Sequence, residues 1–155
     1  MADDDYDDDP DEHYRPRGRG VKYDEDGNEI TSNDTLLALF AHLGLIVGVF
    51  IVPLIIFLVT RQKSPYVARH AKAALNYSIT YLMVVFGWYA VAALIGFIVY
   101  AVGQNGIAGF VTGYILAILG ALAAGISTIV FAIMGAVAAG TAKPFRYPIC
   151  ITFIS

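Results

Sequence analysis

The feature that most constrains the fold of this chain is an uninterrupted run of 70 uncharged residues, from Ala73 to Ala142. A second uncharged run, of 26 residues, extends from Thr35 to Thr60. About 20 consecutive apolar residues suffice for a helix that crosses a bilayer core. Charged residues make up only 15% of the sequence, against about a quarter in a soluble domain. The sequence therefore predicts an integral membrane protein.

The charged residues divide the chain into two parts of opposite sign. All 13 acidic residues lie between Asp3 and Asp34, together with four basic residues, so this segment carries a net charge of −9. Residues 35–155 contain six basic residues and no acidic one, a net charge of +6. A self-repelling acidic stretch with few large apolar residues cannot form a core. We therefore expect a disordered acidic tail over residues 1–34 and a helical transmembrane domain over 35–155.

Breaks within the apolar runs indicate where the membrane spans end. The sequence GQNG at 103–106 combines two glycines with two amides and interrupts the longer run. We expect spans at about 36–59, 77–102 and 109–138. The last segment is longer than one crossing needs, and a single tilted or protruding helix is favoured over two spans. The predicted fold class is all-α, a three-helix transmembrane bundle.

A polar helix start precedes the second span. Ser64 and Pro65 are typical of the cap and the first position of a helix. Arg69, Lys72 and Asn76 then follow at spacings that place them on one helix face. Such a short amphipathic helical turn suits the membrane interface, where the charged groups reach water.

Basic residues outside the tail predict the orientation of the chain. Positively charged loops stay on the cytoplasmic side of a membrane. Two spans separate the two basic patches, so both patches and the C-terminus are expected to be cytoplasmic, in the cell (plasma) membrane. The acidic tail would then lie outside, whereas a four-span alternative keeps the tail inside but moves the second patch outside. We expect the basic residues outside the tail to determine the topology, and they are candidate contacts for anionic lipid headgroups. They are Arg61, Lys63, Arg69, Lys72, Lys143 and Arg146.

The absence of acidic residues from the body argues against several kinds of chemistry. Carboxylates within a membrane mark proton relays and cation sites, and none occurs after Asp34. We expect no enzyme activity, no catalytic residue, no metal, no cofactor and no nucleic-acid partner. His42 is expected to be a buried, hydrogen-bonded side chain, with a titrating or ligand role as the alternative, and His70 is expected at the interface. Cys150 is expected to be a small apolar filler, with lipidation as the alternative.

Small residues recur at every fourth position of the third expected span. They permit close helix approach, either inside the bundle, which is favoured, or between copies of the chain. Trp88 is expected to pack between helices. Tyr66, Tyr77, Phe145 and Tyr147 are expected to anchor the membrane interface. The helix-packing residues are Gly109, Gly113, Ala117, Ala121 and Gly125.

Three stretches together resemble a known family: AHLGLIVGVFIVPLIIFLV, SPYVARHAKAALNYSIT and FRYPICITFIS. They look like the small prokaryotic membrane proteins of domain of unknown function 4870, which are distantly similar to the twenty-kilodalton component of the chloroplast Tic import machinery. The chain departs from that pattern after Gly140, where an acidic residue is missing. The resemblance implies a compact helical membrane domain. Its landmarks here are His42, Pro53, His70, Asn76, Arg146, Tyr147 and Pro148.

Two functions remain open on these grounds. The first is a non-enzymatic membrane protein for interaction, assembly or translocation, as the resemblance to the Tic component implies. The alternative is a small oligomeric channel or carrier for a neutral or anionic solute. The expected partners are the lipid bilayer, anionic lipids, and other membrane proteins or further copies of the chain.

Overall fold

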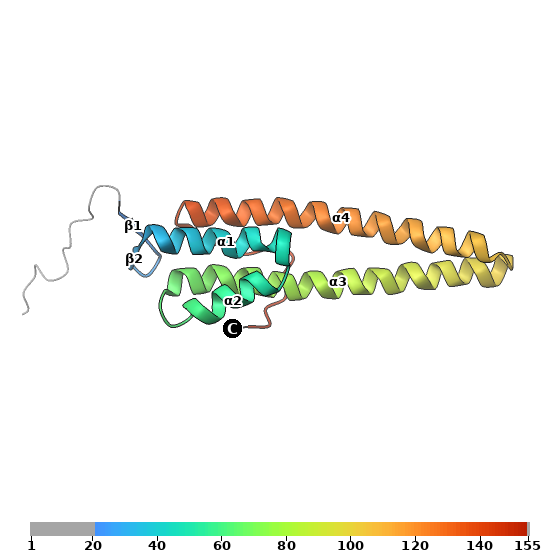
Figure 1. Ribbon diagram of the computed structural model, residues 1–155, viewed down its shortest axis with the longest axis horizontal. Coiled ribbons are helices and arrows are strands. Elements are labelled where there is room, and N and C mark those ends of the chain that lie inside the picture. The colour runs from blue at the N-terminus through green and yellow to red at the C-terminus, as the bar shows by residue number, and fades with distance from the viewer. Residues whose placement is uncertain (1–20, 155) are drawn as a thin grey trace, which may run out of the picture.

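The computed structural model describes residues 21–154, and in this range it contains four helices and one short antiparallel hairpin (Figure 1). The strands are β1 (Lys22–Tyr23) and β2 (Glu29–Ile30). The helices are α1 (Ser32–Gly48), α2 (Ile51–Thr60), α3 (Pro65–Gly103) and α4 (Gly106–Gly140). The apolar body is thus all-helical, as predicted. The disorder predicted for residues 1–20 falls outside the described residues.

Part of the predicted disordered tail forms the hairpin β1–β2. Lys22 pairs with Ile30 across the two strands, and Gly27 has a φ of +79° in the connecting turn. The Asp26-Gly27 pair suits such a turn because glycine adopts positive φ without a steric cost. Ile30 is buried against the helical body, so apolar packing holds the hairpin in place.

The predicted first span is two helices rather than one. Val49 ends α1 with a φ of +36°, which a β-branched residue seldom adopts. Pro53 lies in the first turn of α2, where backbone N–H groups have no intrahelical acceptor in any case. Gly44 and Gly48 leave the space that Val52 occupies, because a Cβ atom on either glycine would meet the Val52 side chain. These residues, which favour a kink, here break the helix completely.

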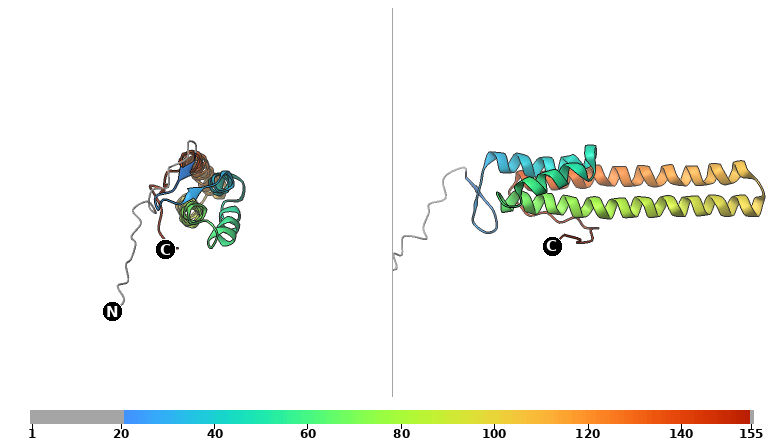
Figure 2. Two further views of the ribbon diagram at one scale, coloured as in Figure 1. Left: turned by 90° about the vertical axis from the view of Figure 1, so that its left-hand side faces the viewer. Right: turned by 60° about the horizontal axis from the view of Figure 1, so that its bottom comes forward.

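Helix α2 runs back alongside α1, so the two form a helical hairpin (Figures 1 and 2). Asp34 in the first turn of α1 accepts a hydrogen bond from Ser64, which caps the start of α3. The Ser78 hydroxyl, further along α3, donates to the Val49 carbonyl at the tip of the hairpin. The chain therefore enters α1 and leaves α2 at the same end of the molecule. The described range has four helices, so the predicted three-helix count is not confirmed. Hydropathy cannot distinguish one long crossing helix from two shorter antiparallel helices.

Helices α3 and α4 form a longer hairpin that extends well past α1 and α2 (Figure 1). The turn between them uses Gln104 at a φ of +49° and Asn105, whose side chain caps α4 through the Ala108 N–H. The GQNG break and the single helix in the last segment agree with the prediction. A 39-residue helix is about 58 Å long, against a bilayer core of about 30 Å.

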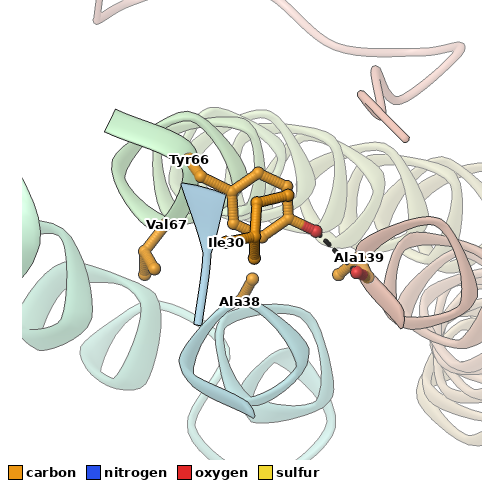
Figure 3. Close-up of a cluster of buried hydrophobic side chains, with 5 residues drawn as sticks. All are labelled: Ile30, Ala38, Tyr66, Val67 and Ala139. Atoms are coloured by element: carbon orange, nitrogen blue, oxygen red, sulfur yellow. Dashed lines mark hydrogen bonds between the residues drawn. The ribbon is translucent and has the colours of Figure 1, made fainter. Parts of the chain in front are cut away.

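The end where α1 begins has a small packed interior (Figure 3). Residues from the hairpin and three helices meet there, and the Tyr66 hydroxyl of α3 donates to the Ala139 carbonyl of α4 over 2.5 Å. The buried residues are Ile30, Ala38, Tyr66, Val67 and Ala139. This interior fixes the hairpin and the ends of α3 and α4 relative to one another.

The outer surfaces of the long helices are apolar and exposed. Phe86 and Phe97 on α3 and Phe110 on α4 are 69%, 63% and 73% exposed. Both helices are long and apolar enough to cross a membrane, with an average hydropathy of 2.4 in their most apolar windows. Apolar surface of this extent is removed from water when lipid surrounds it. The fold is that of a membrane-associated helical protein.

Candidate functional site

A chain of three polar side chains lies in the interior, where α1, α3 and the C-terminal segment meet. His42 of α1 is 0% exposed. Its Nδ1 lies 2.6 Å from the Tyr147 hydroxyl, and its Nε2 lies 2.9 Å from Nδ1 of His70 on α3. Buried polar groups require such partners, because an unpaired one costs about 1–3 kcal/mol. The three side chains therefore connect segments that are distant in sequence.

Close packing holds the His42 ring in position. A Cβ atom on Gly135 of α4 would meet the ring, so only glycine leaves room for it. Phe145 contacts the ring edge-on at a centroid separation of 5.6 Å. The ring of His70 contacts Tyr66 at 4.7 Å. The orientation of both imidazoles is thus set by neighbours from every surrounding segment.

The segment after α4 folds back along α3 and brings Tyr147 to the histidines. The Asn76 side chain accepts hydrogen bonds from the backbone N–H groups of Phe153 and Ile154, at 3.1 and 2.9 Å. Asn76 also donates to the Ile154 carbonyl at 3.2 Å. The Tyr147 ring stacks on Tyr77 with centroids 4.4 Å apart. An extended segment without helical hydrogen bonds is thereby fixed by one asparagine and one stacked ring.

A cavity of about 520 Å³ lies between the hairpin β1–β2, the start of α3 and the C-terminal segment. His70 and Tyr147 belong to its wall, so the buried chain reaches the cavity. Its charged wall residues are Asp24, Glu25, Arg69, Lys72 and Arg146. The cavity is the place where the acidic hairpin and the basic residues of the body meet.

Arg69 joins the hairpin to α3 by two ion pairs. Its guanidinium donates to Asp24 at 2.7 Å and also to Asp26. Burial alone would raise the pKa of Asp24, but hydrogen bonds from Asn28 and the charge of Arg69 lower it below its ordinary value. The Asp24 carboxylate also accepts the backbone N–H groups of Asp26 and Asn28. Protein donors thus satisfy the Asp24 carboxylate.

Burial favours the neutral form of two groups in the C-terminal segment, the Tyr147 hydroxyl and the Cys150 thiol. Burial raises the pKa of the Tyr147 hydroxyl above its ordinary value. Burial likewise raises the pKa of the Cys150 thiol, which a hydrogen bond with Thr80 opposes. A thiol in this state is a weak nucleophile. Within residues 21–154, no three or more His, Cys, Asp or Glu side chains are grouped as a metal site requires.

The structure places the predicted basic residues at one end of the molecule. Arg61 and Lys63 lie in the connection between α2 and α3, and Arg69 and Lys72 lie in the first turns of α3. Lys143 and Arg146 follow the end of α4. The carbonyl of Gly140, the last residue of α4, accepts a hydrogen bond from the Lys22 ammonium group at 2.5 Å. Their role in orienting the chain stays a prediction.

Several residues expected at the interface lie inside the protein. His70 is 3% exposed, and Tyr66, Tyr77 and Tyr147 are each 5–6% exposed. Their aromatic and polar character suits an interface anchor equally well, but their hydrogen bonds are internal. No local spacing relates His42 to His70 or Tyr147, so the sequence carries no direct signal for their contact. Pro53 and Asn76, two other landmark residues, are also buried.

The small residues of α4 have different surroundings. Gly109 and Gly113 approach Gly96 and the Ala92 carbonyl of α3, which agrees with packing inside the bundle. Ala117 lines a shallow groove between the two helices. Ala121 is exposed, and no atom lies within 4 Å of a Cβ position on Gly125. Trp88 lies between the helices and donates to the Leu116 carbonyl at 2.8 Å.

Comparison with known proteins changes the family assignment. The model of the magnetosome magnetite crystal formation protein family matches residues 33–154. The resemblance to domain of unknown function 4870 and to the Tic component was therefore wrong. No match to the chain was found among curated proteins or among solved structures.

Proposed function

This chain belongs to the magnetosome magnetite crystal formation protein family, and from that membership we propose that it is a non-enzymatic protein of the magnetosome membrane that supports growth of the magnetite crystal. The family match over nearly all of the helical body is the observation that carries the proposal. This location replaces the cell membrane that the sequence alone suggested. The two long apolar helices supply the attachment to the membrane.

The character of the buried site supports a non-enzymatic role. His42 has both ring nitrogens engaged, one by Tyr147 and one by His70, so it has no free lone pair for a substrate. Ser127 donates to a carbonyl of its own helix and has no neighbouring base among its hydrogen-bond partners. Such side chains serve to hold segments together.

The arrangement of the helices suggests how the chain faces the two sides of the membrane. Because α2 returns to the end where α1 begins, only α3 and α4 cross completely. The hairpin β1–β2, the loop at 61–64 and the C-terminal segment then share one side, which the basic residues mark as cytoplasmic. The turn at Gln104 and Asn105 is the described part that faces the opposite side. We therefore place the charged interactions of the protein on the cytoplasmic surface, where it assembles with lipids or other proteins.

Deletion of the chain from the cell that produces it tests the proposed function. Electron microscopy should show smaller or fewer magnetite crystals, and a copy of the full chain should restore their size. The same copy with a fluorescent tag should be found with the magnetosomes. An unchanged crystal-size distribution, or a tagged protein spread through the cell membrane, would contradict the proposal.

A further inference from the structure

The charged cavity contains two basic side chains that have no partner among the described residues 21–154. Arg69 is neutralised by Asp24 and Asp26. Lys72 and Arg146 also belong to the wall, and neither forms a hydrogen bond or ion pair with any residue in the described range. The exposed Glu25 is the one wall carboxylate left without an ion pair in that range. Arg69, Lys72 and Arg146 together balance Asp24, Asp26 and Glu25, so it is the local pair of uncompensated cations, Lys72 and Arg146, that favours an anion.

The buried polar chain adds a directed hydrogen-bond donor to the same cavity. If the Tyr147 hydroxyl donates to His42 Nδ1, then His42 Nε2–H donates to His70 Nδ1, and both protons between the three side chains have an acceptor. In the reverse direction the Tyr147 hydrogen would have no acceptor in the described range. The first direction leaves His70 with a proton on Nε2. Every fully buried nitrogen or oxygen side-chain atom in that range has a hydrogen-bond partner. His70 Nε2 has no such partner, so it is not fully buried, and we infer that its N–H faces the cavity that His70 lines.

We propose that this cavity binds the phosphate of an anionic membrane lipid, held by Lys72, Arg146 and the Nε2–H of His70. Two cationic donors and one neutral donor suit the acceptor oxygens of a phosphate diester, whose single negative charge they would neutralise. Ala73, Phe145 and Ile154 form an apolar part of the wall, which suits the glycerol and upper acyl carbons of a lipid. The cavity lies at the charged end of the two long helices, where a headgroup would reach it.

The test compares two double variants that remove the same charge from the same end of the protein. Lys72→Gln with Arg146→Gln changes the cavity, whereas Arg61→Gln with Lys63→Gln changes the neighbouring loop, which does not line it. Neither Lys72 nor Arg146 has a partner to lose among residues 21–154, so we expect the fold to be retained. Native mass spectrometry of the detergent-solubilised full chain measures binding of phosphatidylglycerol, with phosphatidylcholine as the neutral lipid. A separate titration uses inorganic phosphate.

The proposal predicts that phosphatidylglycerol binds in preference to phosphatidylcholine, and that the cavity variant loses roughly tenfold or more in affinity. The loop variant should lose clearly less. Equal losses in the two variants would show only a general attraction to cations and would overturn the proposal, as would no preference for the anionic lipid. Binding of inorganic phosphate as tight as that of the lipid would overturn the lipid as the source. The test depends on membrane attachment and is independent of crystal formation.

Discussion

His42 and His70 meet in the interior at 2.9 Å, although 28 positions separate them and they come from different helices. This contact, with Tyr147 on the other side of His42, fixes the first helical hairpin and the C-terminal segment to α3. These polar contacts thus hold the segments together at the charged end, whereas close helix packing and the hydrogen bond from Trp88 to the Leu116 carbonyl join the distant parts of α3 and α4.

Replacement of His42 by phenylalanine should destabilise the protein by roughly 2–4 kcal/mol. The larger phenyl ring has to fit a closely packed site, and it leaves the Tyr147 hydroxyl and His70 Nδ1 buried and unpaired. Thermal unfolding in detergent measures the effect. Trp88→Phe, which removes one hydrogen bond from a side chain that is 41% exposed, should cost clearly less. Equal stability of the two variants would refute the structural role of His42.

Two glycine substitutions in α4 should have opposite effects. Gly135→Ala places a methyl group against the His42 ring and should destabilise by roughly 1–3 kcal/mol. Gly125→Ala meets no atom within 4 Å and should stabilise slightly, because alanine favours helix by about 1 kcal/mol over glycine. The same unfolding measurement compares both. A neutral Gly135→Ala would mean that His42 is not packed against α4.

Acidification should release the hairpin β1–β2 from α3. The folded-state pKa of Asp24 is lower than its ordinary value of 3.8, so its contribution to stability is complete above that pH. The contribution is lost as the pH falls through the lower, folded-state value. The protection of residues 21–31 against hydrogen exchange, relative to the intrinsic rate at each pH, should therefore fall in strong acid. Asp24→Asn should show fast exchange already at neutral pH, and slow exchange in this variant would contradict the role of the ion pair.

Loss of the Asn76 side chain should free the C-terminal segment. Asn76→Ala removes three hydrogen bonds to Phe153 and Ile154. The Cys150 thiol then becomes exposed, its pKa falls towards the ordinary value, and a thiol reagent should label it several-fold faster. Asn105→Ala, which removes the cap of α4 at the far end, serves as the control. Unchanged labelling in Asn76→Ala would show that other contacts hold the segment.

Much of the helical framework could be predicted because its signals are local. Ser64 and Pro65 do begin α3, and the GQNG sequence does separate the long helices. The reversal at Val49 could not be predicted, because 26 apolar residues serve equally well for one crossing or for a shorter helical hairpin. Gly44, Gly48 and Pro53 were the relevant signal, but they fit a kink as well as a break.

The candidate site was harder to predict than the helices. His42 has the buried, hydrogen-bonded environment that was expected, but its partners come from distant parts of the chain. His70 and Tyr147 have side chains that suit a membrane interface, and nothing in their local sequence distinguishes an interior position. Only the folding back of the C-terminal segment onto Asn76 brings them together.

The most direct test of the account is the side of the membrane on which the acidic tail lies. Single cysteines at Asp8, Gln62 and Asn105, in a Cys150→Ser background, can be labelled with a membrane-impermeant reagent in intact and opened vesicles. The helical hairpin α1–α2 predicts that Asp8 and Gln62 are labelled from the same side and Asn105 from the other. Labelling of Asp8 and Gln62 from opposite sides would show that residues 35–60 cross the membrane and would contradict the account.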